Sequence, residues 1–405
     1  MNNTLKPETF TMKDVKALII GAGLAGTAAA MACQRVGIDA VVYEAYDRTA
    51  HGVGASLGLA VNGFDVLRTL GVAEQVRATG WPTNKIALWN GNGRQLATAE
   101  DGTIEMTAER ARIYGALYDE TVRRGIPIEH GKRLVGAEHR DGQVIALFDD
   151  GSSASGTVLI GADGMYSAVR GIVAPDAPKP HYVGLTGGGG YTKPMDLGLD
   201  SNTFHMVFGK RAFFAYAGLP DGRVGWFANV PTPVEPTGDD LAAVTSDARK
   251  RQLLYLFAVD NTPAERIIEA TGSIDLWGPL HHMDPPKQWY RDRMVVIGDA
   301  AHVPSPSSGQ GASLALEDAV ELAKCLRDLP DPASAFAAFQ QLRAKRVAKV
   351  IAAAKRTNSD KAAGPVGRVI RDALAPTAIK LFARPGSRAW LYQRHIDLDE
   401  PVLAH

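Results

Sequence analysis

The hydrophobic pattern begins with a short apolar strand, a glycine turn and an Ala-rich helix. Residues 15–20 (VKALII) are apolar and β-branched without alternation, which is typical of a strand buried on both faces. The Ala-rich segment TAAAMACQRV follows, Gly37 ends it, and the next apolar run is IDAVVYEA. Strand, helix and strand within about thirty residues predict a β-α-β unit.

The next stretch alternates between helical and strand patterns. Residues 61–78 and 108–124 have helical periodicity, and short alternating segments separate them over 81–100. The run VIALFDDGSSASGTVLIGADG predicts a hairpin that leads into a buried strand.

From about residue 183 to 278 the chain is aromatic-rich. The runs TFHMVFG, AFFAYAGLP and RVGWFANVP have turn residues between them, which predicts a mixed or antiparallel sheet. RMVVIGDA then returns to the buried-strand pattern, and beyond Ser313 the sequence is largely helical.

Composition excludes several classes of partner. Lys+Arg and Asp+Glu are 44 each, so the net charge of zero favours neither nucleic acid nor an anionic membrane. The 2 cysteines are too few for a disulfide framework, which fits the cytoplasm. The uncharged run from Ala17 to Cys33 reads better as a buried strand, turn and helix than as a membrane span, so we expect no integral membrane association.

The first glycine turn carries a dinucleotide-binding pattern, because it follows a strand and opens a helix. Gly21 permits the tight turn, Gly23 lets a pyrophosphate approach, and Gly26 allows close packing of helix on strand. Glu44 ends the second strand, where an acid binds an unphosphorylated ribose, so FAD or NAD is favoured over NADP. A glycine turn without a ligand is the alternative. The contact residues expected here are Gly21, Gly23, Leu24, Ala25, Gly26 and Glu44.

Two later motifs carry a resemblance to a family. MVVIGDAAHVPSPSSGQGASLALEDA resembles the second FAD motif of the single-component aromatic hydroxylases, the para-hydroxybenzoate hydroxylase-like flavoprotein monooxygenases. GADGMYSAVR (161–170) resembles their middle signature. With the first glycine turn, the three motifs stand in the family order, and the resemblance covers about residues 14–325.

The resemblance implies further contacts with FAD. Asp299, at a strand end, would accept a ribityl hydroxyl, although a helix cap alone is the other reading. Backbone amides at a helix start would stabilise negative charge on the reduced flavin. Ser167 and Arg170 either serve this site or only cap and anchor a helix, and Arg110 is either an FAD contact or a solvated arginine. The contacts implied are Arg110, Asp163, Gly164, Asp299, Pro306, Gly309, Gln310, Gly311, Ala312 and Ser313.

The expected fold class is α/β. It combines a Rossmann-like FAD-binding domain of the GR2 type, an inserted mixed β-sheet substrate domain and a helical C-terminal region. The FAD-binding domain is expected to be discontinuous, over 14–80, 101–182 and 279–330. Residues 81–100 and 183–278 would form the substrate domain, and 331–405 the helical region.

The resemblance also implies the reaction. NADPH or NADH visits as a transient co-substrate and reduces the flavin, and O2 then gives a flavin hydroperoxide that hydroxylates an aromatic or polycyclic small molecule. No residue is a certain catalyst and no metal site is expected. His205 and Arg211 are candidates for orienting a phenolate or carbonyl. The wall over the flavin is expected to comprise Tyr191, His205, Met206, Arg211, Phe213, Phe214, Tyr216 and Trp226.

Other functions stay open from the sequence. A reductase or desaturase of the same fold would insert no oxygen, and a flavin-binding sensor would keep the cofactor without turnover. The protein is expected to be a monomer or a homodimer in aromatic catabolism or secondary metabolism.

Overall fold

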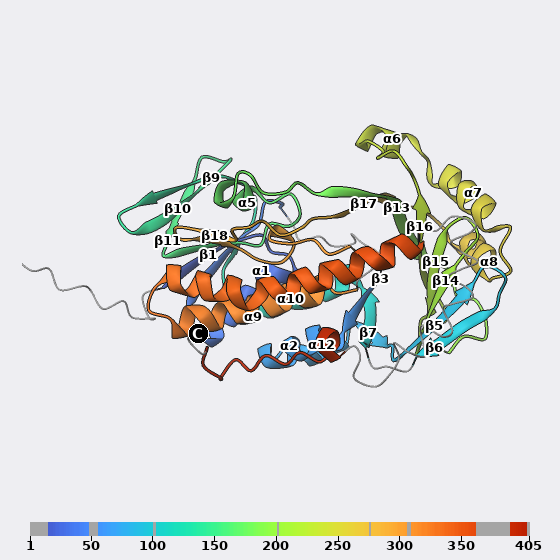
Figure 1. Ribbon diagram of the computed structural model, residues 1–405, viewed down its shortest axis with the longest axis horizontal. Coiled ribbons are helices and arrows are strands. Elements are labelled where there is room, and N and C mark those ends of the chain that lie inside the picture. The colour runs from blue at the N-terminus through green and yellow to red at the C-terminus, as the bar shows by residue number, and fades with distance from the viewer. Residues whose placement is uncertain are drawn as a thin grey trace, which may run out of the picture.

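The computed structural model describes residues 15–47, 56–99, 103–200, 202–274, 277–305, 309–361 and 389–402. A largely parallel sheet holds the first glycine turn, with the strand order β18-β19-β12-β1-β2-β8, in which β18 and β19 are antiparallel to each other (Figure 1). In that order the strands span Tyr290–Arg291, Met294–Val296, Val158–Gly161, Lys16–Ile20, Asp39–Tyr43 and Ile128–Glu129. Because β1 has β2 on one side and β12 on the other, it lies where the strand order reverses, the place where open α/β sheets bind ligands.

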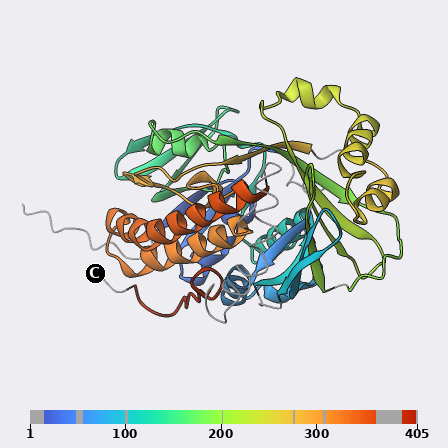
Figure 2. The ribbon, with the colours of Figure 1, turned by 45° about the vertical axis from the view of Figure 1, so that its right-hand side comes forward.

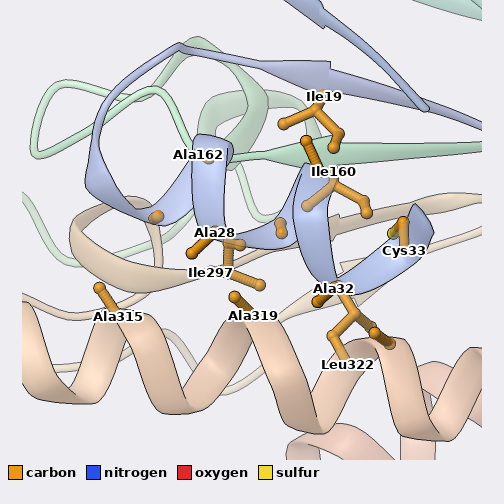
Figure 3. Packing of buried hydrophobic residues seen from close by; sticks show 14 of the residues in the cluster. Ile19, Ala28, Ala32, Cys33, Ile160, Ala162, Ile297, Ala315, Ala319 and Leu322 are labelled. Atoms are coloured by element: carbon orange, nitrogen blue, oxygen red, sulfur yellow. The ribbon is translucent and has the colours of Figure 1, made fainter. Parts of the chain in front are cut away.

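Two helices are stacked on this sheet through small side chains, one against the sheet and the other against the first helix. They are α1 (Leu24–Arg35) and α9 (Gly311–Asp328). Figure 3 shows Ala28 and Ala32 of α1 between the sheet and Ala315 and Ala319 of α9, in a fully or nearly fully buried cluster. Side chains this small let the two helices approach closely.

Shorter elements complete the region around this sheet. The antiparallel strands β11 (Ser153–Gly156), β10 (Gln143–Phe148) and β9 (Leu134–Arg140) form one small sheet, and β3 (Ser56–Ala60), β7 (Ile104–Glu109) and β4 (Gly80–Pro82) form another. The helices are α2 (Val61–Leu70), α3 (Ala73–Arg77), α4 (Arg110–Arg123), α5 (Ala168–Val173) and the 3-10 turn η2 (Gly298–Ala300).

A second large sheet is mixed and carries helices on its outer side (Figures 1 and 2). Its strand order is β17-β13-β16-β15-β14-β5-β6. Among the described strands of this second sheet, only β14 and β5 pair in parallel. In that order the strands span Trp277–His282, His181–Tyr191, Val224–Pro231, Phe213–Gly218, Thr203–Phe208, Lys85–Asn90 and Gln95–Ala99. The helices are α6 (Gly238–Ala243), α7 (Ser246–Phe257) and α8 (Ala264–Ala270).

The chain ends in a long helix and a tail that returns to the first sheet's helices. Helix α10 (Pro332–Lys361) lies along α9. The segment 389–402 begins with α12 (Ala389–Tyr392) and runs beside α2, as the dark red trace in Figures 1 and 2 shows. Its Ile396 and Leu398 are 3% exposed and belong to the core under the first sheet.

The expected fold class is confirmed, with one local difference. The helical pattern at 61–78 divides into α2 and α3 because Gly71 adopts a left-handed conformation, with φ of 72°, that ends the first helix. Strands β5 and β6, within 81–100, join the sheet formed by strands of 183–278, in keeping with the predicted grouping. The division into domains stays a prediction.

Candidate functional site

The first glycine turn is shaped by backbone contacts. Gly21 has φ of +102°, and a Cβ added there would lie 2.6 Å from the carbonyl oxygen of Ala162. A Cβ on Gly26 would lie 1.9 Å from the carbonyl oxygen of Gly21, so only glycine fits. A Cβ on Gly23 would meet nothing within 4 Å. The turn is therefore packed against the backbone at Gly21 and Gly26 and open at Gly23. Gly23 stands at the start of α1, where free amides and the helix dipole favour a phosphate.

Glu44 lies beside this turn, at the end of β2. Its carboxylate accepts hydrogen bonds from the backbone amides of Ala22, at 2.7 Å, and Tyr46, at 3.1 Å. Leu24 and Ala25 are buried at the start of α1, so they can offer a ligand their backbone amides but little of their side chains.

The two distant glycine motifs meet in space. A Cβ on Gly298 would lie 3.0 Å from the Cβ of Ala25 and 3.1 Å from that of Ala315. Gly298 therefore sits between α1 and α9, and the turn that carries Asp299 lies next to the start of α1. One long ligand can reach both motifs.

Asp299 is half-buried and lies near Arg110. Burial raises the pKa of Asp299, and the charge of Arg110 opposes that rise. Arg110 donates through Nε to the hydroxyl of Tyr114 at 2.8 Å, and its guanidinium lies 5.0 Å from the centre of that ring. The structure thus brings Arg110 and Asp299 together, and it adds Tyr114, which the sequence reasoning missed. Arg110 and Tyr114 stand one helical turn apart, which is the signal that could have found the tyrosine.

The turn at the start of α9 packs on α2 and is hydrogen-bonded to it. Gly309 has φ of +60°, and a Cβ on it would meet nothing within 4 Å. Gln310 is fully buried and its Oε1 accepts from Nδ2 of Asn62 at 3.0 Å. Gly311 and Ala312 are half-buried, and Ser313 packs against Gly63. Pro306 lies outside the described residues. Asn62 was not predicted, because a lone asparagine in a helical pattern gives no signal of its tertiary partner.

The middle signature is mainly a helix cap. The carboxylate of Asp163 accepts from the amides of Ala168, at 2.7 Å, and Val169, at 3.1 Å, and from the hydroxyl of Ser167. Ser167 caps α5, and Arg170 donates to the carbonyl oxygens of Ala300, at 3.0 Å, and Met165, at 2.7 Å. Of the two readings left open, capping and anchoring is the one that the contacts of Ser167 and Arg170 support. The carboxylate of Asp163 thus binds the helix start, and its expected contact with the cofactor stays a prediction. Gly164 has φ of +79° and faces open space.

The second large sheet has an inner and an outer face. The outer face packs on α7 and α8 and includes Val207, Phe214, Tyr216 and Trp226. His205 stacks on Tyr216 with ring centres 4.7 Å apart, so it shares this face. Arg211 is exposed beside α7, with its guanidinium 4.6 Å from the ring centre of Tyr255.

The expected wall residues therefore separate. His205, Arg211, Phe214, Tyr216 and Trp226 point away from the first sheet, and their expected contact with a substrate there is corrected. For the four strand residues the reason is the alternation of side chains along a strand, which the aromatic content of the sequence does not reveal. Arg211 lies between β14 and β15, outside either strand.

The inner face carries the remaining expected residues and three that were not predicted, two phenylalanines and an alanine. Strand register places Met206 opposite Ala215 and Phe227, and Tyr191 lies further along the same face. Phe204 and Phe213 each have ring centres within 6.2 Å of that of Phe227. The members of this inner face are Tyr191, Phe204, Met206, Phe213, Ala215 and Phe227.

The inner face is linked to the flavin motifs through one arginine. The guanidinium of Arg223 lies 5.3 Å from the ring centre of Tyr191 and 3.6 Å from Oε1 of Glu109. Glu109 directly precedes Arg110, which neighbours Asp299. Phe204, Met206 and Phe227 are only half-buried, as expected of residues that line a space rather than fill a core.

Trp81 on β4 lies outside the two hydrophobic cores. It pairs with Thr107, whereas the alternate residues Met106 and Ala108 of β7 belong to the core under the first sheet. Trp81 is 6% exposed, belongs to neither core cluster, and its indole Nε1 has no hydrogen-bond partner in the described part of the chain.

The residues present fit FAD. Glycines 23, 164 and 309 each leave open space where a side chain would stand, and Asp299 as a residue is only half-buried. Two helix starts, those of α1 and α9, converge on this space with free amides. The arrangement can bind a pyrophosphate at one end and a flavin at the other.

Comparisons with known proteins agree with this geometry. Residues 14–354 match the family model described as an FAD binding domain. The FAD-dependent urate hydroxylase of Klebsiella pneumoniae is 29% identical over 84% of this chain and 89% of its own length. The aurachin C monooxygenase/isomerase of Stigmatella aurantiaca is 31% identical over 84% of this chain and 88% of its own length. The 3-amino-4-hydroxybenzoate 2-monooxygenase of Streptomyces cremeus is 29% identical over 96% and 97%.

Solved structures show the same relation. Klebsiella pneumoniae HpxO complexed with FAD and uric acid superposes with a TM-score of 0.84 at 25% identity, covering 95% of this chain and 99% of that one.

Proposed function

Because the chain belongs to the single-component FAD-dependent aromatic hydroxylases and is an FAD-dependent monooxygenase, we propose that it hydroxylates a planar aromatic compound held against the inner face of the second sheet. The observation that carries this proposal is the row of half-buried aromatic and thioether side chains at Phe204, Met206 and Phe227. Such side chains bind flat rings by stacking and by apolar contact.

The chain's own residues would bind FAD, orient the substrate and shield the reacting ring from water. Bound FAD, reduced by NADPH or NADH, supplies the activated oxygen, of which one atom enters the substrate and the other leaves as water. The turn at Gly23 and the start of α1 would hold the pyrophosphate, and Asp299 would accept a hydrogen bond from the ribityl chain. The start of α9, from Gly309 to Ser313, would present amides to the flavin end, where negative charge collects on reduction.

The inner face would exclude water from the reacting ring. Phe213 is 1% exposed, so it belongs to the buried part of the inner face. The indole N–H of Trp81, without a partner of its own, is the donor that we propose orients a substrate oxygen. Because the candidates His205 and Arg211 are turned away, the proposal assigns no base or cation of this sheet to the reaction.

The relatives support a narrower proposal for the substrate. Their names specify urate, aurachin C and 3-amino-4-hydroxybenzoate, all of which contain a planar ring with oxygen or nitrogen substituents. We propose a substrate of that class, and the half-buried Arg223 near Tyr191 would lie at its edge.

The setting and organisation are proposals as well. No helix in the described ranges is long and apolar enough to cross a membrane. The buried, unpaired thiols of Cys33 and Cys325 support action in the cytoplasm. We also propose a monomer or a homodimer that does not bind nucleic acid. We propose an FAD-binding domain over 14–80, 101–182 and 279–330, a substrate domain over 81–100 and 183–278, and a helical region over 331–405.

The test is oxygen-dependent turnover. FAD-loaded protein is mixed in air with NADPH or NADH and with each of urate, 3-amino-4-hydroxybenzoate and aurachin C. The expected result is faster oxidation of the nicotinamide with one compound and a product that takes its new oxygen atom from labelled O2. Reduction of the substrate without labelled oxygen would identify a reductase, and a flavin that neither nicotinamide reduces would identify a sensor. A protein that binds no FAD would contradict the proposal.

A further inference from the structure

Two consecutive acids on α9, Glu317 and Asp318, lie fully buried beneath the candidate flavin site. Neighbouring residues on a helix point in different directions, so the two carboxylates reach different partners. Asp318 accepts from the amide of Gly298 at 2.9 Å and pairs with Nε2 of His302 at 2.7 Å. It therefore ties both ends of the turn that carries Asp299.

Glu317 reaches the other half of the site. Its Oε1 accepts from Nδ2 of Asn62 at 2.7 Å, and the same nitrogen donates to Oε1 of Gln310 at 3.0 Å. Gln310 precedes the first residue of α9, in the turn whose amides would face the flavin. Through Asn62, Glu317 therefore fixes the turn from Gly309 to Ser313.

Both carboxylates are neutralised from α10. Arg343, fully buried, donates to Glu317 through Nη1 at 2.6 Å and to Asp318 through Nε at 2.7 Å. Arg346 donates twice to Glu317, each time at 2.7 Å. Burial by itself would raise the pKa of Glu317, but the charges of Arg343 and Arg346 hold that pKa below its ordinary value.

Arg346 also binds the carboxyl-terminal strap, which we define as residues 389–402. Its guanidinium donates to the carbonyl oxygens of Trp390 and Leu391, and Lys349 lies 3.9 Å from the ring centre of Trp390. Further along, the strap meets α2, where His395 pairs with Asp65 at 2.6 Å. The strap therefore joins α10 to α2, the helix that bears Asn62.

We infer that Arg343 and Arg346, with the carboxyl-terminal strap, are positioning residues that hold the two flavin-binding turns at a fixed separation. The inference rests on the proposed flavin site. Neither arginine has to touch the cofactor. Each acts through Glu317 and Asp318, and a bidentate guanidinium sets the geometry of two carboxylates in a way that a lysine ammonium does not.

The test compares conservative variants on the FAD-loaded full chain. Arg343→Lys and Arg346→Lys keep the positive charge but lose the planar guanidinium that donates from two nitrogens. We expect each to weaken FAD binding at least tenfold, measured by flavin fluorescence. A loosened turn would lose more affinity for the reduced, negatively charged flavin than for the oxidised one. If the affinity for reduced flavin falls tenfold relative to the affinity for oxidised flavin, the midpoint potential of the bound flavin falls by about 30 mV.

The matched control is Arg327→Lys. Arg327 also binds the strap, through the carbonyl oxygens of Leu398 and Glu400, and pairs with Asp328, but it is not a partner of Glu317 or Asp318. The Arg327→Lys variant keeps the strap's contacts with Arg346 and Asp65, so it should leave FAD affinity and midpoint potential unchanged. A purely structural role for Arg343 and Arg346 would lower thermal stability alone, with potential and affinity as in the parent protein, and that result would overturn the inference.

Two further arms keep the outcomes separate. If Arg343→Lys does not fold, two other variants test the inference. They are Arg346→Lys and a chain that ends at residue 388, and in both of them Arg343 keeps its ion pairs with Glu317 and Asp318. Unchanged affinity and potential in these two variants would overturn the inference. If the parent protein binds no FAD, the proposed function fails instead.

Discussion

At the scale of single residues, glycine positions separate folding from binding. Gly26 is required by the fold, because its missing Cβ lets α1 pass the carbonyl of Gly21. Gly23 is required by nothing in the protein itself: its φ of −74° and ψ of −171° suit any residue, and its missing side chain faces open space. The same motif therefore contains one glycine for structure and one for a ligand.

This difference predicts opposite behaviour of two alanine variants. Gly23→Ala should leave the unfolding free energy of the FAD-free protein within about 0.5 kcal/mol of the parent and weaken FAD binding at least tenfold. Gly26→Ala should destabilise the FAD-free protein by about 1–3 kcal/mol. Urea unfolding and flavin fluorescence measure the two quantities. Equal loss of stability in both variants would refute the assignment of Gly23 to the ligand.

At the scale of elements, the two faces of one strand have different tasks. Along β14, Met206 points to the inner face and His205 to the outer face, where it accepts a hydrogen bond from Nε1 of Trp89 at 3.1 Å. Burial lowers the pKa of His205, which favours its neutral form. Neighbouring residues of the same strand can therefore be compared directly.

Substitutions on the two faces should affect catalysis differently. Met206→Ala removes apolar contact with the substrate and should lower kcat/KM about tenfold, mainly through KM. His205→Gln should leave kcat and KM unchanged, since its ring packs on Tyr216. Steady-state kinetics with the identified substrate measures both. A larger effect at His205 than at Met206 would mean that the outer face takes part.

The buried acids of α9 make the stability of this element depend on pH. Burial would raise the pKa of Asp318, but His302 and Arg343 together lower it to about 2. The unfolded state then binds a proton more readily than the folded state, so stability is fully present above about pH 4 and is lost as the pH falls toward 2.

Asp318→Asn should flatten this acid dependence. The parent protein should lose on the order of 2 kcal/mol from Asp318 alone between pH 4 and pH 2, and the variant should lack that part of the slope while being less stable at pH 7. Urea unfolding across this pH range gives both values. Parallel slopes in the two proteins would show that Asp318 keeps its ordinary pKa when folded.

At the scale of the whole molecule, the site is assembled from stretches far apart in the chain. The first glycine turn, the N-terminal end of α2, the turn at Asp299 and the start of α9 converge at one edge of the first sheet. The strap returns from the end of the chain to the same helices. The second sheet contributes only its inner face, and its outer face serves its own core.

FAD should therefore protect separated segments together. In hydrogen exchange, amides of residues 21–26, 298–302 and 309–313 should slow on FAD binding, and α2 should slow with them through Asn62. Helix α7, on the outer face, should exchange at the same rate with and without FAD. Protection confined to residues 21–26 would show that only the nucleotide end is held.

The sequence by itself determined the fold class and the cofactor. Glycine spacing at 21–26, the strand end at Glu44 and the motif around Asp299 are local signals, because a turn, a helix start and a strand end each need particular residues within a few positions. The family resemblance joined them into one FAD site, and the comparisons confirm the cofactor and the reaction class.

Only the tertiary structure decided which side chains meet. The sequence could not tell that His205 and Met206 point to opposite sides of the second sheet, since both faces carry apolar residues and the aromatic pattern does not alternate. Nor could it tell that Arg343, Glu317, Asp318 and Asn62 form one buried group. These four residues come from three separate helices, α2, α9 and α10, and long-range pairing leaves no local pattern in the chain.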